Sequence, residues 1–168
     1  MCIRDRFEGQ GRYVIALQYL EQSLTADQRL GAKANEALDM GWLGNLHFSR
    51  GEYDDARRCL EMVLTLDREI GGSEEEVWHL SLLGAVAYET GDMAEAESYF
   101  REAIQLARER GATLGLHEVY RRLAAVHLVQ GDGEAALAAA RQAMAEAEAG
   151  DDEKAIGSCY LILGTVYG

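Results

Sequence analysis

The strongest constraint on this chain is a repeat of 40 residues, marked by small amino acids at fixed positions. Glycines recur with this period in two interleaved series, which are Gly11, Gly51, Gly91, Gly131 and Gly31, Gly71, Gly111. Two further series share the frame, one of alanines (Ala16, Ala56, Ala96, Ala136) and one of leucine plus a small residue (Leu43-Gly44, Leu83-Gly84, Leu123-Ala124, Leu163-Gly164). Four series in one frame predict a single structural unit used several times.

Each period contains two stretches with the apolar spacing of an amphipathic helix. In one such stretch Tyr53, Ala56, Leu60, Val63 and Leu64 are separated mostly by three or four positions, and the residues between them are mainly charged. Proline, which interrupts helices, is absent from the whole chain. The pattern therefore predicts two amphipathic helices per repeat, joined by short turns.

The residues between these stretches are typical of helix ends. Gly71 and Gly111 follow helical stretches, where a residue without a Cβ can adopt the left-handed conformation that ends a helix. Asp92, Asp132 and Ser73 are predicted N-caps of the helices that follow them.

Small residues also recur inside the first helix of each pair, at Gly44, Gly84, Ala124 and Gly164. Glycine costs about 1 kcal/mol relative to alanine in a helix interior, so its recurrence indicates close approach to a neighbouring helix. We expect the alanine series of the second helices to face these positions.

These residues resemble the tetratricopeptide repeat, whose pattern is W-x2-L-G-x2-Y followed by A-x3-F and a terminal proline. The clearest matches are Leu43-Gly44 with Ala56 and Leu60, and Leu83-Gly84 with Ala96 and Phe100. The longer period and the missing proline are similar to a long-helix subclass found in bacterial transcription activators, signalling ATPases and quorum-sensing regulators. The resemblance implies an all-α, right-handed α-solenoid of stacked antiparallel helix pairs.

The repeat frame divides the chain into segments. We expect the solenoid to span residues 7–168, as a partial repeat 7–31, full repeats 32–71, 72–111 and 112–150, and a partial repeat 151–168. Residues 1–6, MCIRDR, resemble a translated sequencing-library adapter and are expected to be non-native. Because solenoids need polar capping repeats, we interpret the chain as an internal fragment of a larger protein.

Composition narrows the classes of partner. The chain has 16 Lys and Arg against 29 Asp and Glu, a net charge of −13, which disfavours binding to nucleic acid. It contains no apolar run of the ~18 residues needed to span a membrane, so no membrane association is expected. Three isolated cysteines favour a reducing compartment, and we predict a cytoplasmic protein.

Catalytic patterns are weak, and we predict no enzyme, no cofactor and no metal site. The stretch His117–Arg121 begins like a zinc-binding H-E-x-x-H motif but has arginine in place of the second histidine. The G-x-G-x-x-A match at Gly131 lacks the preceding strand that a dinucleotide site requires. His47 and His127 occupy the same frame position and are interpreted as packing histidines.

The resemblance implies that the first helices line a concave groove that binds partners. The candidate groove residues are Asn45, Phe48, Trp78, Tyr88 and Arg121. Family members often place at the Asn45 position an asparagine that binds a peptide backbone, and Arg121 could bind a carboxylate. Trp78 and Tyr88 could instead pack between repeats, and Arg121 could pair with Glu118.

The leading hypothesis is therefore a non-catalytic protein–protein interaction scaffold that binds a peptide or partner helix in its groove. The alternative is an effector-sensing segment of a multidomain bacterial transcription activator or signalling ATPase, whose partner could be another domain of the same chain.

Overall fold

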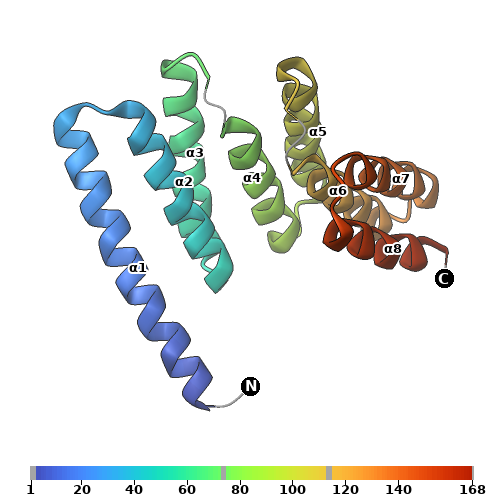
Figure 1. The fold of residues 1–168 in the computed structure, drawn as a ribbon, viewed down its shortest axis with the longest axis horizontal. Coiled ribbons are helices and arrows are strands. Elements are labelled where there is room, and N and C mark those ends of the chain that lie inside the picture. The colour runs from blue at the N-terminus through green and yellow to red at the C-terminus, as the bar shows by residue number, and fades with distance from the viewer. Residues whose placement is uncertain (1–2, 73–74, 113–114, 168) are drawn as a thin grey trace. The chain divides into compact units, whose positions relative to one another are not determined.

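A computed structural model describes residues 3–72, 75–112 and 115–167 of the chain, with side chains from Tyr13 onward. Eight α-helices and no strand make up these residues (Figure 1). They are α1 (Ile3–Leu30), α2 (Lys33–Arg50), α3 (Tyr53–Glu69), α4 (Glu76–Thr90), α5 (Met93–Arg110), α6 (Leu116–Gln130), α7 (Gly133–Ala149) and α8 (Glu153–Tyr167). The all-helical prediction is confirmed. The predicted N-cap Ser73, like Met1 and Cys2, lies outside the described residues.

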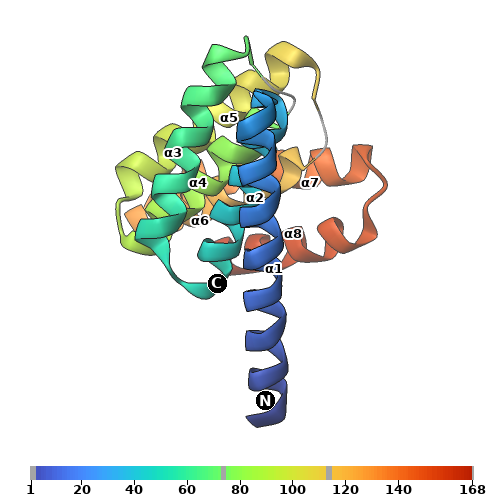
Figure 2. The ribbon, with the colours of Figure 1, turned by 90° about the vertical axis from the view of Figure 1, so that its left-hand side faces the viewer.

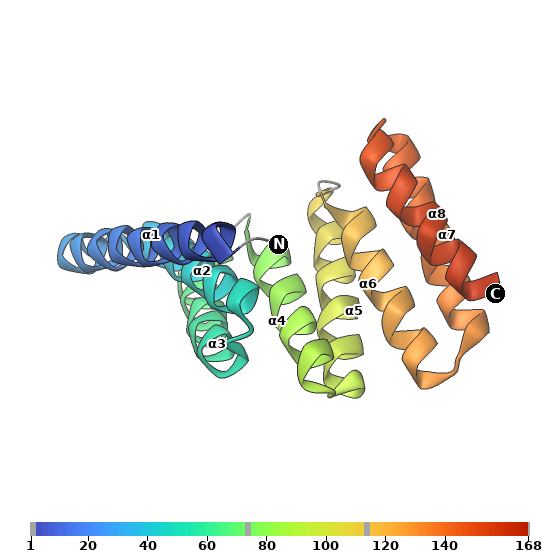
Figure 3. The ribbon, with the colours of Figure 1, turned by 90° about the horizontal axis from the view of Figure 1, so that it is seen from below.

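The chain forms two compact units, residues 1–79 and 80–168, and α4 begins in the first and ends in the second. In the first unit α2 packs against both α1 and α3. In the second unit α6 packs against α5, α7 and α8, and α7 also packs against α8 (Figure 3). Helix α1 is 28 residues long, and its first turns extend beyond the end of α2 (Figure 2).

The helix ends follow the predicted turn chemistry. Gly71 and Gly111 adopt positive φ angles of 85° and 67°, a region that side chains with a Cβ rarely enter. The carboxylates of Asp92 and Asp132 accept hydrogen bonds from the backbone N–H groups of Glu95 and Ala135, at 3.0 and 2.9 Å. Both aspartates are therefore the N-caps that the sequence predicted.

The glycines inside the first helices are notches that hold large side chains. A Cβ added at Gly44 would lie 2.8 Å from Cγ of Leu60, and one added at Gly84 would lie 2.6 Å from Cε1 of Phe100. Leu60 and Phe100 are fully buried. We expected the alanine series to face these glycines. The backbone carbonyl oxygen of Ala56 does lie 3.5 Å from a Cβ added at Gly44, but the nearest atoms at each notch belong to the large residue one helical turn after the alanine.

The third pair of helices, α6 and α7, uses small residues on both sides. Ala124 of α6 occupies the notch position, and Ala140 of α7 occupies the position of Leu60 and Phe100. Both are fully buried. The small residue of the first helix is therefore kept while the size of its partner varies between repeats.

We expect Gly84→Ala to lower the stability of the chain. The added methyl group meets the buried Phe100 ring, and overpacking of this kind costs about 1–3 kcal/mol. Gly164→Ala is the matched control, because its added Cβ meets nothing within 4 Å and alanine favours helix by up to ~1 kcal/mol. Urea unfolding followed by circular dichroism measures both; equal stability of the two variants would contradict the notch.

Candidate functional site

A hollow of about 460 Å³ opens between α1 and α2 in the first unit. Its lining is largely apolar and consists of Ala16, Tyr19, Leu20, Trp42, Asn45, Leu46 and Ser49. Tyr19 and Trp42 are large aromatic residues that remain 70% and 49% exposed. Apolar walls with one or two polar groups are typical of sites that bind other molecules.

Asn45 supplies a side-chain amide to the wall of this hollow. The residue is half-buried, and its amide forms no hydrogen bond with another described residue. A side-chain amide offers both a donor and an acceptor, the combination that a peptide backbone also presents. Of the five predicted groove residues, Asn45 is the one that lines the hollow.

The predicted aromatic candidates of the first unit make intramolecular contacts. The ring of Trp78 lies 5.0 Å from that of Trp42 and 5.1 Å from that of His79, measured between centroids. The ring of Phe48 lies 5.9 Å from that of Tyr53. Both side chains are half-buried, as the packing alternative for Trp78 predicts.

The remaining two candidates, Tyr88 and Arg121, lie in the second unit. Tyr88 is half-buried near the end of α4. Arg121 donates two hydrogen bonds to the carboxylate of Glu118, at 2.7 and 2.6 Å, and Arg122 donates a third at 2.9 Å. Burial opposes ionisation of Glu118, but the two arginines hold its pKa below the ordinary value. Arg121 therefore forms the ion pair with Glu118 that the sequence offered as the alternative to binding a partner's carboxylate.

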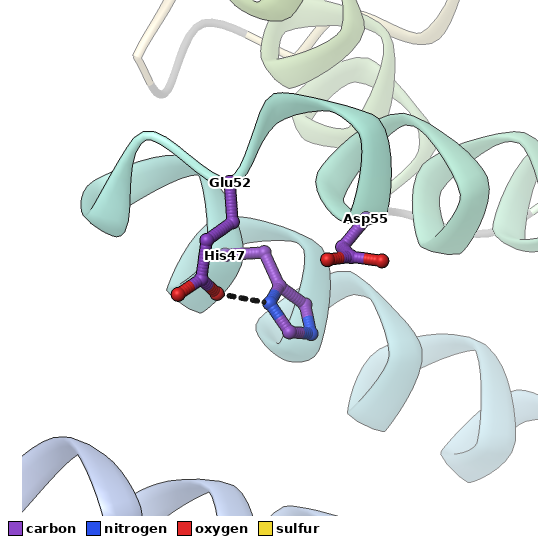
Figure 4. A group of neighbouring side chains, drawn as sticks. All are labelled: His47, Glu52 and Asp55. Carbon is purple, nitrogen blue, oxygen red and sulfur yellow. Dashed lines mark hydrogen bonds and ion pairs between the residues drawn. The ribbon is translucent and has the colours of Figure 1, made fainter.

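A polar cluster joins Tyr13 of α1 to the turn between α2 and α3, and Figure 4 shows two of its members, His47 and Glu52. His47 donates from Nδ1 to Oε2 of Glu52 at 2.7 Å, and the hydroxyl of Tyr13 donates to the same oxygen at 2.7 Å. The guanidinium of Arg50 lies 4.4 Å above the centre of the Tyr13 ring. Burial and the hydrogen bond to Glu52 raise the pKa of Tyr13 to about 12. His47 is thus hydrogen-bonded, as expected of a packing histidine.

His47, Glu52 and Asp55 each place one possible ligand atom within 4.8 Å of the others. Imidazole and carboxylate are ligands for zinc, so this geometry could hold a divalent cation. However, Glu52 already accepts two hydrogen bonds, and Asp55 forms an ion pair with Arg58. Because the carboxylates are already partnered, we interpret the cluster as structural, and the absence of a metal site stays a prediction.

A fully buried pair that the sequence analysis missed links α3 to α4. His79 donates from Nδ1 to Oδ2 of Asp67 at 2.8 Å, and neither side chain is exposed. A Cβ added at Gly41 would collide with the His79 ring, so this glycine is a further notch. The sequence did contain a sign of this pair, which is a charged residue at a position expected to be apolar. Asp67 follows Val63 and Leu64 on the buried side of α3.

The chain matches models of known protein families in two places. Residues 36–109 and residues 117–142 each match a model described as tetratricopeptide repeat, and together they cover more than half of the chain. The search of curated proteins found no match.

Several solved structures share the fold at low sequence identity. BtubC from P. vanneervenii has a TM-score of 0.86 and 19% identity, with 97% of this chain and 68% of that chain covered. PcrH from Pseudomonas aeruginosa has a TM-score of 0.65 and 18% identity, with 79% and 92% covered. The N-terminal domain of the C. elegans stress-induced protein STI-1 has a TM-score of 0.62 and 17% identity, with 78% and 97% covered. These likenesses support an all-α, tetratricopeptide-repeat-like solenoid.

None of the described helices combines the length and the hydropathy needed to cross a membrane.

We expect Glu52→Gln to destabilise the chain at neutral pH but not in acid. Hydrogen bonds from His47 and Tyr13 lower the pKa of Glu52 below 4.5. A carboxyl group whose pKa is lowered by folding stabilises the fold above its unfolded pKa, and this contribution is lost as the pH falls through the folded pKa. The melting temperatures of variant and unaltered chain should therefore differ at pH 7 and converge in acid, once the pH has fallen below the lowered pKa of Glu52 in the folded chain. Glu134→Gln, at an exposed glutamate of α7, is the control.

We expect Asp67→Ala to destabilise the first unit, because it leaves the buried Nδ1 of His79 without its acceptor. An unpartnered buried polar group costs about 1–3 kcal/mol. Asp54→Ala changes an exposed aspartate of the same helix and should cost much less. Chemical unfolding of both variants tests the pair, and equal effects would show that the buried hydrogen bond contributes nothing specific.

Proposed function

Because this chain belongs to the tetratricopeptide repeat family, whose fold suggests protein–protein interaction, we propose that it is a non-catalytic scaffold that binds a peptide or partner helix. The observation that carries the proposal is the open hollow between α1 and α2, with exposed aromatic walls and the Asn45 amide. An exposed aromatic pair beside an amide that has no partner among the described residues offers both apolar contact and backbone recognition.

The repeat frame favours a helix as the occupant of this hollow. Leu20 of α1 stands at the position that Leu60 holds in α3 and Phe100 in α5. Those two side chains are buried in the glycine notches of α2 and α4, whereas Leu20 is only half-buried and lines the hollow. A helix with a small residue at the matching depth would cover Leu20 as α2 covers Leu60.

The regulatory alternative shares this fold and rests on the family resemblance. Nothing in the lining of the hollow favours a small effector over a helix, since its walls are apolar and its polar groups are Asn45, Ser49 and the Tyr19 hydroxyl. We therefore keep the scaffold as the proposed function.

A display library of random peptides about 15 residues long, enough for four helical turns, tests this proposal. We expect peptides selected on the unaltered chain to bind Trp42→Ala at least about tenfold more weakly, because a large apolar wall is lost. Asn45→Ala should weaken them by roughly fivefold, the value of one hydrogen bond.

Gln142→Ala, at an exposed position of α7 outside the hollow, is the control and should leave binding unchanged. Circular dichroism should show the same helix content in all variants. Selected peptides that bind the Trp42 and Asn45 variants as tightly as the unaltered chain would exclude the hollow as the binding site.

A further inference from the structure

A second hollow, of about 530 Å³, lies between α5 and α6 in the second unit. Both are interior helices of the chain, with α4 before them and α7 after them. Three buried residues, none more than 7% exposed, line the hollow and are Ile104, Tyr120 and Leu123. The rest of the lining is exposed and polar or charged, and consists of Arg101, Gln105, Arg108 and Glu109. Buried apolar side chains beside a few polar groups are typical of binding sites.

The guanidinium of Arg108 is held in place by a buried phenol. Its Nη2 donates a hydrogen bond of 2.6 Å to the hydroxyl of Tyr120, and its central carbon lies 5.9 Å from the centre of the Tyr120 ring. Tyr120 is 5% exposed, so this exposed arginine is anchored on the core. No carboxylate of the described residues forms an ion pair with Arg108. Because a guanidinium has five N–H donors, most of them remain available to a ligand.

The other polar groups of the hollow already have partners. Arg101 donates from Nε to Oε1 of Glu97 at 2.9 Å, and its Nη2 lies 2.8 Å from the same oxygen. Gln105 donates from Nε2 to Oε1 of Glu109 at 2.8 Å. Arg108 is therefore the cation of this hollow that no carboxylate of the described chain neutralises.

The combination of arginine and tyrosine at these positions is not a requirement of the repeat. The positions one period away along the chain hold other pairs, which are Gln28 with Met40, Arg68 with Leu80, and Glu148 with Tyr160. The helices of the repeat therefore form without this pair, and a role in binding would account for it where it occurs.

We propose that this hollow binds an acidic side chain of a partner protein, whose carboxylate pairs with Arg108 while a neighbouring apolar side chain covers Ile104 and Leu123. A guanidinium donates two parallel hydrogen bonds to a carboxylate, which gives the contact both strength and direction. The one unpaired cation and the nearby Glu109 favour a ligand with one negative charge over the nearly two charges of a phosphate group.

The hollow is open, which favours a side chain of a protein over a free small acid. A small molecule in an open hollow is covered on one side only, whereas a protein segment adds contacts around the rim. The site shares no residue with the hollow between α1 and α2, so it goes beyond the proposed function and is tested separately.

The net charge of −13 opposes an acidic partner at long range. At an ionic strength of about 0.15 M, however, exposed charges more than about 8 Å apart are largely screened from one another. An ion pair with Arg108 acts at hydrogen-bond distance, well inside this range. The binding measurements below therefore use this ionic strength.

Nuclear magnetic resonance of the Ile104 and Leu123 methyl groups locates binding at this hollow. The probes are the blocked dipeptides acetyl-Leu-Glu-amide and acetyl-Glu-Leu-amide, which carry one carboxylate beside one apolar side chain in either order. We expect dissociation constants of about 1–10 mM, because each probe makes a single small contact. The matching glutamine dipeptides should bind roughly tenfold more weakly, since they lose the charge-assisted hydrogen bonds.

Arg108→Gln removes the cation and should weaken binding of the glutamate dipeptides roughly tenfold, to the level of the glutamine dipeptides. Lys154→Gln is the matched control, because it removes the same charge from an exposed position of α8 outside the hollow and should leave binding unchanged. Tyr120→Phe keeps the guanidinium but removes the hydroxyl that positions it. It should weaken the glutamate dipeptides by about two- to fivefold and leave the glutamine dipeptides unaffected. Circular dichroism should show equal helix content in all variants.

The proposal would be overturned if neither glutamate dipeptide shifted these methyl signals at concentrations up to about 20 mM, or if the glutamine dipeptides bound equally well. It would also be overturned if Lys154→Gln weakened binding as much as Arg108→Gln, because net charge alone would then be responsible. Acetate that binds as tightly as the dipeptides would show that the apolar neighbour contributes nothing. Inorganic phosphate that binds more tightly would identify a general anion site instead. Peptides selected on the hollow of the first unit test the proposed function independently of these results.

Discussion

The fold depends on the fit of one large side chain into a notch left by one missing Cβ. Phe100 occupies the space over Gly84, and Leu60 occupies the space over Gly44, in both cases with no exposed surface. An interior glycine destabilises a helix by about 1 kcal/mol relative to alanine, so the notch is favourable where the close packing that it allows contributes more than that. Gly41, against the ring of His79, extends the same device to a contact between α2 and α4.

Polar interactions stabilise the places where this apolar packing ends. Tyr13, His47 and Glu52 connect α1 to the turn that joins α2 and α3, through two hydrogen bonds of 2.7 Å. The buried pair of Asp67 and His79 connects α3 to α4 without access to water. Such pairs contribute chiefly by favouring one arrangement of the helices, since any other arrangement would leave a buried polar group without its partner at a cost in folding free energy.

The same packing rule accounts for the hollow to which we assign the proposed function. Leu20 holds the frame position of Leu60 and Phe100, but it lines the hollow between α1 and α2 and is only half-buried. The exposed rings of Tyr19 and Trp42 lie beside Leu20 in the lining of this hollow. The proposed site is therefore made from the same helices that build the fold.

The sequence by itself determined that the chain is helical and where several of the helices end, although Gly11, a member of one glycine series, lies inside α1. The 40-residue period, the positive-φ glycines and the Asp92 and Asp132 caps depend on local chemistry, which acts between residues a few positions apart. It also identified Asn45 as a candidate, although that expectation came from the family resemblance.

The tertiary structure decided which side chains meet, because residues far apart in the chain share one space only after the helices pack. It showed that Leu60 and Phe100, rather than the alanines, fill the notches, and that Asp67 pairs with His79. Periodicity places a residue on one face of its own helix, but the opposing residue depends on the depth and rotation of the neighbouring helix, which the period leaves open.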